Sequence, residues 1–96
     1  MITMESIVVA SEDHVSSPLG DELVVLDTQS GVYYGLNALG AFIWMLIQKP
    51  TPVITLRDAI MGEFAVEREV CERDLLALLA DMQSNSLVSV REGGAA

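Results

Sequence analysis

Two residues of this 96-residue chain have the side chains most often used in catalysis and metal binding: His14 is its only histidine and Cys71 its only cysteine. A Cys–His pair can act as a nucleophile with its base, or supply two ligands of a metal ion. A metal site needs several converging ligands, however, and these two residues fall in different predicted elements. We therefore expect no metal site and no catalytic dyad. His14 is expected to be a solvated loop residue, and Cys71 a small buried hydrophobic residue.

A second chemical candidate is the segment 35–40, which has the glycine spacing of a phosphate-binding loop. Such a loop places Lys and then Ser or Thr after its last glycine, but Ala41 and Phe42 stand there instead. The acidic pairs at 12–13 and 21–22 lie in turn-rich segments, where adjacent acids usually face solvent. The sequence thus predicts neither an enzyme nor a cofactor.

The charge balance excludes some partners. The chain has 14 Asp and Glu against 5 Lys and Arg, a formal net charge of −9, which repels nucleic acid and anionic membranes. The longest apolar run, 38–47, is about half the length of a membrane span. Residues 1–20 contain no Lys or Arg, so a signal peptide is not predicted. We expect one cytoplasmic domain over residues 1–96, ordered from about 5 to 90, without nucleic-acid or membrane partners.

The N-terminal part of the chain has the pattern of strands. Segments 5–10, 23–26 and 32–36 are rich in β-type residues, whereas the segment 16–21 has the composition of a loop. The second and third strands are joined by a short polar segment that ends in Gly31, a residue able to take a positive φ. This layout predicts a β-hairpin.

Three helices are expected next. Asn37 is a favoured N-cap for a helix that ends near Gln48, and the prolines at 50 and 52 then force an extended connector. Thr55 is expected to cap a second helix, with Asp58 as the acid of a shortened capping box. A third helix is predicted over 67–84, followed by a strand over 87–90 and a frayed tail over 93–96.

Two motifs in these elements resemble the PqqD-like family. One reads LD, G-x-Y-x-x-LN and then I-W, and the other is a Leu-rich helix followed by a late Leu. The matching residues are Leu26, Asp27, Gly31, Tyr33, Tyr34, Leu36, Asn37, Ile43 and Trp44, then Asp74, Leu75, Leu78, Leu79, Met82 and Leu87. The resemblance covers about residues 5–90. It departs where Asn85 and Ser86 replace the Gly that many relatives have before the final strand.

The resemblance implies an α+β, winged-helix-like fold: a three-stranded antiparallel sheet packed on three helices, with a short C-terminal strand. It also implies a stand-alone recognition element that binds the leader of a ribosomally synthesised precursor peptide and delivers it to a processing enzyme. In lasso-peptide pathways that partner is a leader peptidase. In pyrroloquinoline-quinone-type cofactor pathways it is a radical enzyme. We favour the lasso setting because of the chain length and the extended N-terminal strand.

The residues themselves indicate how such a peptide would bind. The strand 32–36 has only one strand neighbour nearby in sequence, so its other edge is free to accept an extended peptide as an extra strand. The helix 67–84 would form the far wall, with acids that meet basic leader residues. The candidate peptide-binding residues are Val32, Tyr33, Tyr34, Gly35, Val70, Asp74, Ala77, Leu78 and Asp81.

Three structural alternatives stand beside these roles. Tyr33 and Tyr34 are adjacent and point to opposite sides of the strand, so one of them is expected in the core. Asp74 and Asp81 also fit a solvated helix face, and Trp44 fits a core anchor.

Two other function classes are compatible with the element order. A winged-helix DNA-binding module needs a basic third helix, whereas the helix here is rich in acids. A small structural subunit would lend an apolar face to a larger enzyme.

Overall fold

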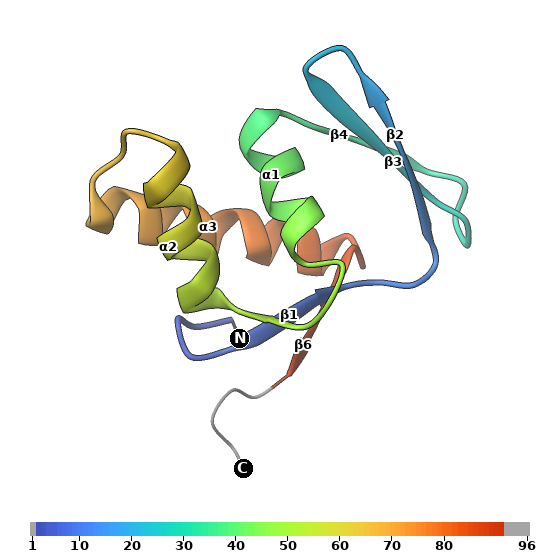
Figure 1. Ribbon diagram of the computed structural model, residues 1–96. Coiled ribbons are helices and arrows are strands. Elements are labelled where there is room, and N and C mark those ends of the chain that lie inside the picture. The colour runs from blue at the N-terminus through green and yellow to red at the C-terminus, as the bar shows by residue number, and fades with distance from the viewer. Residues whose placement is uncertain (1, 92–96) are drawn as a thin grey trace.

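The computed structural model describes residues 2–91 of the chain (Figure 1). The tail expected over 93–96 lies outside these residues. In chain order, the elements are β1 (Ile7–Ala10), β2 (His14–Leu19), β3 (Glu22–Asp27), β4 (Tyr33–Leu36), α1 (Ala38–Leu46), β5 (Thr51–Pro52), α2 (Val53–Glu63), α3 (Arg68–Ser84) and β6 (Val88–Arg91). No helix of the described part is both long enough and apolar enough to cross a membrane.

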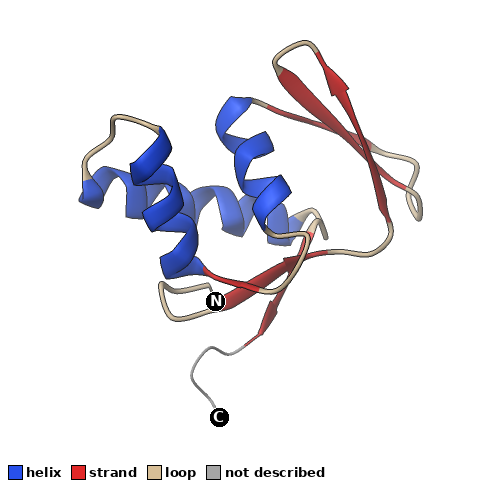
Figure 2. Ribbon diagram, viewed as in Figure 1, coloured by secondary structure: helices blue, strands red, loops and turns tan. Residues whose placement is uncertain are grey.

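The strands form two antiparallel sheets of three strands each, in the orders β2–β3–β4 and β5–β1–β6. The expected α+β class, with a three-stranded antiparallel sheet and three helices, is confirmed. The sequence did not reveal the second sheet, which joins the N-terminal strand to the C-terminal strand. Figure 2 shows β2, β3 and β4 grouped beside α1, whereas β1 and β6 lie below the helices in this view.

The prediction of a loop over 16–21 is wrong, because β2 continues to Leu19 and only Gly20 and Asp21 form the turn. Pro18 is compatible with this strand because β2 lies at the edge of its sheet and pairs only with β3. Gly20 has a φ of 65°, the left-handed conformation that a tight turn requires and that glycine adopts without strain.

The helix starts agree with the sequence in one case and differ in another. Asn37 caps α1 as expected, accepting a hydrogen bond from the Gly40 N–H at 2.9 Å. The cap expected at Thr55 is wrong: α2 already starts at Val53, directly after Pro52. The reason is tertiary, since Pro52 pairs with Ile7 of β1 and the Val53 N–H donates to the Ser6 carbonyl at 2.9 Å.

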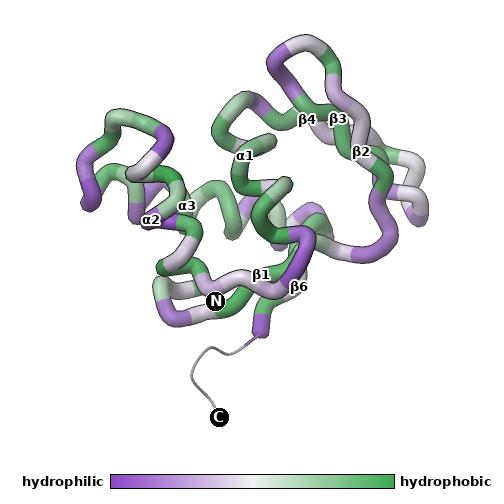
Figure 3. Tube along the Cα trace, viewed as in Figure 1, coloured by the Kyte–Doolittle hydropathy of each residue, from purple (hydrophilic) through white to green (hydrophobic). Residues whose placement is uncertain are grey.

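The core lies between the helices and both sheets. Its fully buried side chains include Val8 of β1, Val25 of β3, Ile43 of α1, Leu56 of α2 and Leu79 of α3. Figure 3 shows hydrophobic residues running along β1, β3 and α1, the elements that line this core. One continuous apolar cluster therefore fixes the β2–β3–β4 sheet relative to α3.

Trp44 and His14 connect that sheet to α1. Trp44 is 3% exposed, which confirms the core-anchor alternative. The expectation of a solvated His14 is wrong: the residue starts β2 and its ring lies edge-on to Trp44, with centroids 5.9 Å apart. Both ring nitrogens are buried without a hydrogen-bond partner. Cys71 is buried, as expected.

Candidate functional site

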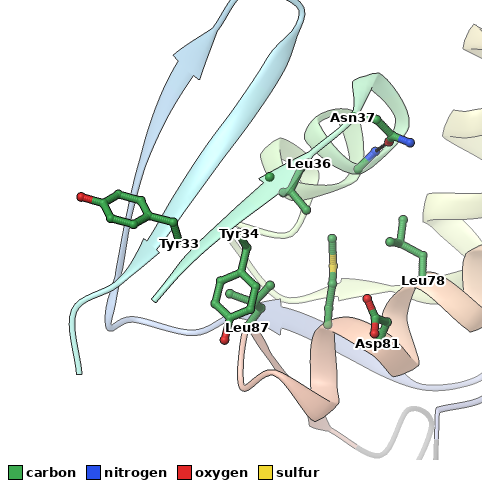
Figure 4. Close-up of a pocket in the computed structure, with 10 residues that line it drawn as sticks. Tyr33, Tyr34, Leu36, Asn37, Leu78, Asp81 and Leu87 are labelled. Atoms are coloured by element: carbon green, nitrogen blue, oxygen red, sulfur yellow. Dashed lines mark hydrogen bonds between the residues drawn. The ribbon is translucent and has the colours of Figure 1, made fainter. Parts of the chain in front are cut away.

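A cleft of about 330 Å³ lies between β4 and the C-terminal half of α3 (Figure 4). One wall consists of β4 and the start of α1, and the other consists of α3 and the residue after its final turn. The lining residues are Tyr33, Tyr34, Gly35, Leu36, Asn37, Gly40, Leu78, Asp81, Met82 and Leu87.

The β4 wall has a free backbone edge, because β4 pairs only with β3. The Asp27 N–H donates to the Val32 carbonyl at 2.9 Å and the Gly31 N–H donates to the Asp27 carbonyl at 2.8 Å, which places Asp27 and Val32 at a hydrogen-bonded position just before the ladder begins. Hydrogen-bonded and non-bonded pairs alternate along an antiparallel ladder, so Tyr34 and Leu36 bond to β3. The N–H and C=O groups of Tyr33 and Gly35 consequently point to the free edge.

The β3–β4 turn holds this edge in place through Asp27, which is 8% exposed. One carboxylate oxygen, Oδ1, accepts hydrogen bonds from the N–H groups of Gln29 and Ser30 at 2.8 and 3.4 Å. The bond from Gln29 is the main reason why the pKa of Asp27 is lowered. Gly31 completes the turn with a φ of 74°, so the hairpin expected from the sequence is confirmed.

The side chains of β4 alternate between two environments. Tyr34 and Leu36 pair with Val25 and Leu23, which are buried, and they therefore share the core face of the sheet. Tyr34 packs against the core, whereas Tyr33 is 68% exposed. Figure 4 shows Tyr33 turned away from the cleft and Tyr34 turned toward α3. The sequence did not decide which of the two tyrosines lies in the core, and the structure shows that it is Tyr34.

The α3 wall ends in a turn that brings Leu87 into the cleft. Ser86 has a φ of 62°, and the Leu87 N–H donates to the Met82 carbonyl at 2.9 Å. With the 3.0 Å bond from the Ser86 N–H to the Gln83 carbonyl, these contacts form a Schellman C-cap. Ser86 thus holds a left-handed position that glycine would occupy at lower cost, so the helix ends in a Schellman cap without a glycine.

The structure brings together five of the nine candidate residues at this cleft: Tyr33, Tyr34, Gly35, Leu78 and Asp81. Asp74 lines a second, apolar cavity farther along α3. The remaining three, Val32, Val70 and Ala77, are not among the residues that line either cavity. Val32 precedes β4, and Ala77 is exposed on α3.

Sequence reasoning missed five residues that line the cleft: Leu36, Asn37, Gly40, Met82 and Leu87. Leu36 and Asn37 form the LN pair of the motif. However, a residue that ends a strand or caps a helix is not expected at a binding surface for that reason alone. Gly40 is needed for close packing, since a Cβ there would lie 3.2 Å from the Leu36 Cβ. Met82 and Leu87 line the cleft only because the chain reverses direction after the final turn of α3.

The chemistry of the cleft is that of a docking surface: an apolar floor, a free strand edge, and polar groups from Asn37 and Asp81. Within residues 2–91, no three His, Cys, Asp or Glu side chains are placed to hold a metal ion. An extended peptide matches these features, because its backbone would pair with β4 while alternate side chains enter the cleft.

Comparisons with known proteins agree with this geometry. Residues 22–88 match the family model described as coenzyme PQQ synthesis protein D (PqqD). The structure of TbiB1 in complex with the TbiA(beta) leader peptide matches with a TM-score of 0.78 and 35% identity, over 92% of this chain and 98% of that one.

A lasso peptide synthetase B1 complexed with the leader peptide has the same fold, with a TM-score of 0.75 and 24% identity. That match covers 85% of this chain and 96% of the other. None of the curated proteins compared matches the chain.

Proposed function

The chain belongs to the PqqD family, and we propose that it binds the leader region of a ribosomally synthesised precursor peptide by strand addition and delivers it to a processing enzyme. We place this role in lasso-peptide biosynthesis, where the processing enzyme is a leader peptidase. The observation that carries the proposal is the free edge of β4 above a cleft whose other wall is α3.

Backbone pairing would supply the part of the affinity that does not depend on leader sequence. Tyr33 and Gly35 together offer two N–H donors and two C=O acceptors at the free edge, which is the pattern that an added strand needs. A net hydrogen bond contributes about 0.5–1.5 kcal/mol, so a few such bonds must be supplemented by burial of leader side chains.

Alternate leader side chains would supply that burial and the selectivity. One set would enter the cleft and contact Tyr34, Leu78 and Met82, and the other set would lie on the outer face beside Tyr33. Asp81 is exposed at the cleft wall and favours a basic leader residue nearby.

The structural relatives support this choice of ligand, since the 35%-identical TbiB1 was solved with a leader peptide. A second candidate function rests on the description of the family model, coenzyme PQQ synthesis. In that case, the same cleft would present a precursor peptide to a radical enzyme. The two functions share the peptide-binding step and differ in the partner enzyme, so binding assays with each purified enzyme distinguish them.

We propose that the protein acts in the cytoplasm and leaves the peptide chemically unchanged. The single Cys71 is a buried thiol, which fits a reducing compartment. Mass spectrometry of a leader peptide incubated with the protein alone should return the unaltered mass. A cleaved or modified peptide would contradict the proposal of a non-catalytic role.

Strand addition is tested by comparing Gly35→Pro with Gly35→Ala in titrations of a fluorescently labelled TbiA(beta) leader peptide and of the leader encoded beside this chain's gene. Proline removes the Gly35 N–H, which points to the free edge and not to β3. Alanine keeps that N–H, and its Cβ would meet no heavy atom within 4 Å. We expect Gly35→Pro to weaken binding by about 2- to 12-fold or more, the equivalent of one lost hydrogen bond, and Gly35→Ala to bind like the unmodified protein.

Circular dichroism of both variants checks that the hairpin remains folded. Amide hydrogen exchange on the unmodified protein provides a measurement without substitution: Tyr33 and Gly35 should exchange more slowly when the peptide is bound. The proposal is wrong if neither leader binds, or if a bound leader protects β2 and leaves β4 unchanged.

A further inference from the structure

A second cavity, of about 110 Å³, lies between the first turn of α1, the end of α2 and the N-terminal half of α3. It is lined by Leu39, Ile60, Phe64, Val66, Cys71, Asp74 and Leu75. Apart from Asp74, every one of these side chains is apolar or a thiol. Leu39, Phe64 and Val66 are only partly buried, so the cavity opens to the surface.

This cavity and the cleft described above are separate, but both have walls in α1 and α3. Leu39 of α1 is adjacent to Gly40, which lines the cleft. On α3, Asp74 belongs to the cavity, and Leu78 and Asp81 belong to the cleft; a spacing of four and then three residues places all three on one stripe of the helix. Seven residues of helix span about 10.5 Å, which corresponds to about three residues of extended chain.

The walls of the cavity are already in place without a ligand. The Phe64 ring is held edge-on by Phe42, with ring centroids 5.5 Å apart and an interplanar angle of 81°. Cys71 and Leu75 form a buried floor, at 3% and 1% exposure. A preformed apolar site loses little conformational entropy when it is filled.

We propose that this cavity is a subsite for one aliphatic side chain of the leader peptide, located about three to four residues beyond the segment that pairs with β4, at the Leu36 end. The inference rests on the proposed function and adds a determinant of leader selectivity to it. An apolar cavity of about 150 Å³ in another protein accommodates benzene, so this smaller one fits an aliphatic side chain better than an aromatic one. The carboxylate of Asp74 at the rim disfavours an acidic residue next to the anchor.

The test uses TbiA(beta) leader peptides shortened one residue at a time from each end, and the variant Val66→Phe, which fills the cavity from its partly buried side. Ile54→Phe is the matched control, because Ile54 is a 45% exposed residue of α2 that lines neither the cleft nor the cavity. For the unmodified protein, shortening from one end should produce a step of about tenfold in affinity when an aliphatic residue is removed. Val66→Phe should abolish that step, and Ile54→Phe should keep it.

Methyl NMR spectra provide a second measurement that does not depend on Val66→Phe folding correctly. The Leu39 and Leu75 methyl signals should shift with the full leader and return toward their free positions with the peptide that lacks the aliphatic residue. Equal affinity of Val66→Phe and unmodified protein for the full leader, without methyl shifts, would overturn the subsite and leave the proposed function intact. Absence of binding by any peptide would overturn the proposed function itself.

Discussion

Single side chains at the two ends of β4 determine the shape of its free edge. At the start, Asp27 uses one carboxylate oxygen to hold the β3–β4 turn, with Gly31 in the left-handed conformation. At the end, Asn37 stops the strand and starts α1 by accepting the Gly40 N–H. The residues of the LD, G and LN motifs therefore act mainly by geometry: they present the backbone of Tyr33 and Gly35 in a fixed direction.

The cap at Asn37 gives a prediction for a single residue. Asn37→Ala should lower the free energy of unfolding by about 0.5–2 kcal/mol, because an N-terminal amide of α1 loses its acceptor. Asn37→Asp keeps an acceptor oxygen and serves as the control, with a smaller effect. Urea unfolding at neutral pH measures both variants. Equal stability of Asn37→Ala and the unmodified protein would show that the cap does not contribute.

Among the elements, α2 and α3 are joined by a charged contact in addition to their apolar packing. The Arg57 Nη1 of α2 lies 2.6 Å from the Glu72 Oε2 of α3, and the Arg68 Nε lies 3.2 Å from the same oxygen. These bonds, first that of Arg57 and then that of Arg68, lower the pKa of Glu72 below its ordinary value of 4.5. Both helices contribute to the walls of the second cavity, so the contact also supports the proposed subsite.

This contact predicts a pH dependence of stability. A carboxyl group with a lowered pKa in the folded state stabilises the fold at pH values above its unfolded pKa, and the contribution is lost as the pH falls through the folded value. Glu72→Gln should therefore be less stable than the unmodified protein at pH 7, and the gap should narrow as the pH falls below 4.5. Thermal unfolding between pH 7 and 3 measures the gap, with Glu69→Gln, an exposed acid of the same helix, as the control. A gap that does not change with pH would contradict the role assigned to Glu72.

The elements also show which parts of the structure the sequence could predict. The β3–β4 hairpin, the Asn37 cap and α3 depend on local patterns, and each was found at or within a residue or two of its place. The strand β2 and the start of α2 depend on pairing with other strands. Pro18 lies in β2 because that strand pairs with β3, and α2 starts after Pro52 because this residue of β5 pairs with Ile7 of β1. Local propensity does not contain that information.

The candidate site follows the same division. The free edge of β4 was predictable because the hairpin is local, and Leu78 and Asp81 followed from helical spacing. Leu87 was assigned only to a strand, because its place in the cleft depends on the left-handed Ser86. Asp74 was grouped with Asp81 on one face, but α2 and the residues after it enclose that end of the stripe in a separate cavity.

At the scale of the whole molecule, negative charge exceeds positive charge and three of the five basic residues are already paired with acids. Arg57, Arg68 and Arg73 each form an ion pair on α2 or α3. A DNA-reading third helix would need such arginines directed at phosphates. The charge distribution therefore favours a partner that is basic or neutral, consistent with the peptide ligand proposed above.

The formal net charge of −9 leads to a prediction for the stability of the molecule as a whole. Repulsion among unpaired acids destabilises a compact state, and salt screens it, because the Debye length falls from about 30 Å at 0.01 M to about 8 Å at 0.15 M ionic strength. Salt also weakens the ion pairs, but ion pairs at a protein surface typically contribute only about 0–1 kcal/mol each, and the pairs here involve three arginines against 14 acids. The urea midpoint at pH 7 should consequently rise as NaCl is increased over this range.

At a pH near the isoelectric point of 4.2, the same salt increase should have a smaller effect, because the net charge is close to zero. A midpoint at pH 7 that falls with salt would mean that the ion pairs of α2 and α3 outweigh the repulsion among the acids.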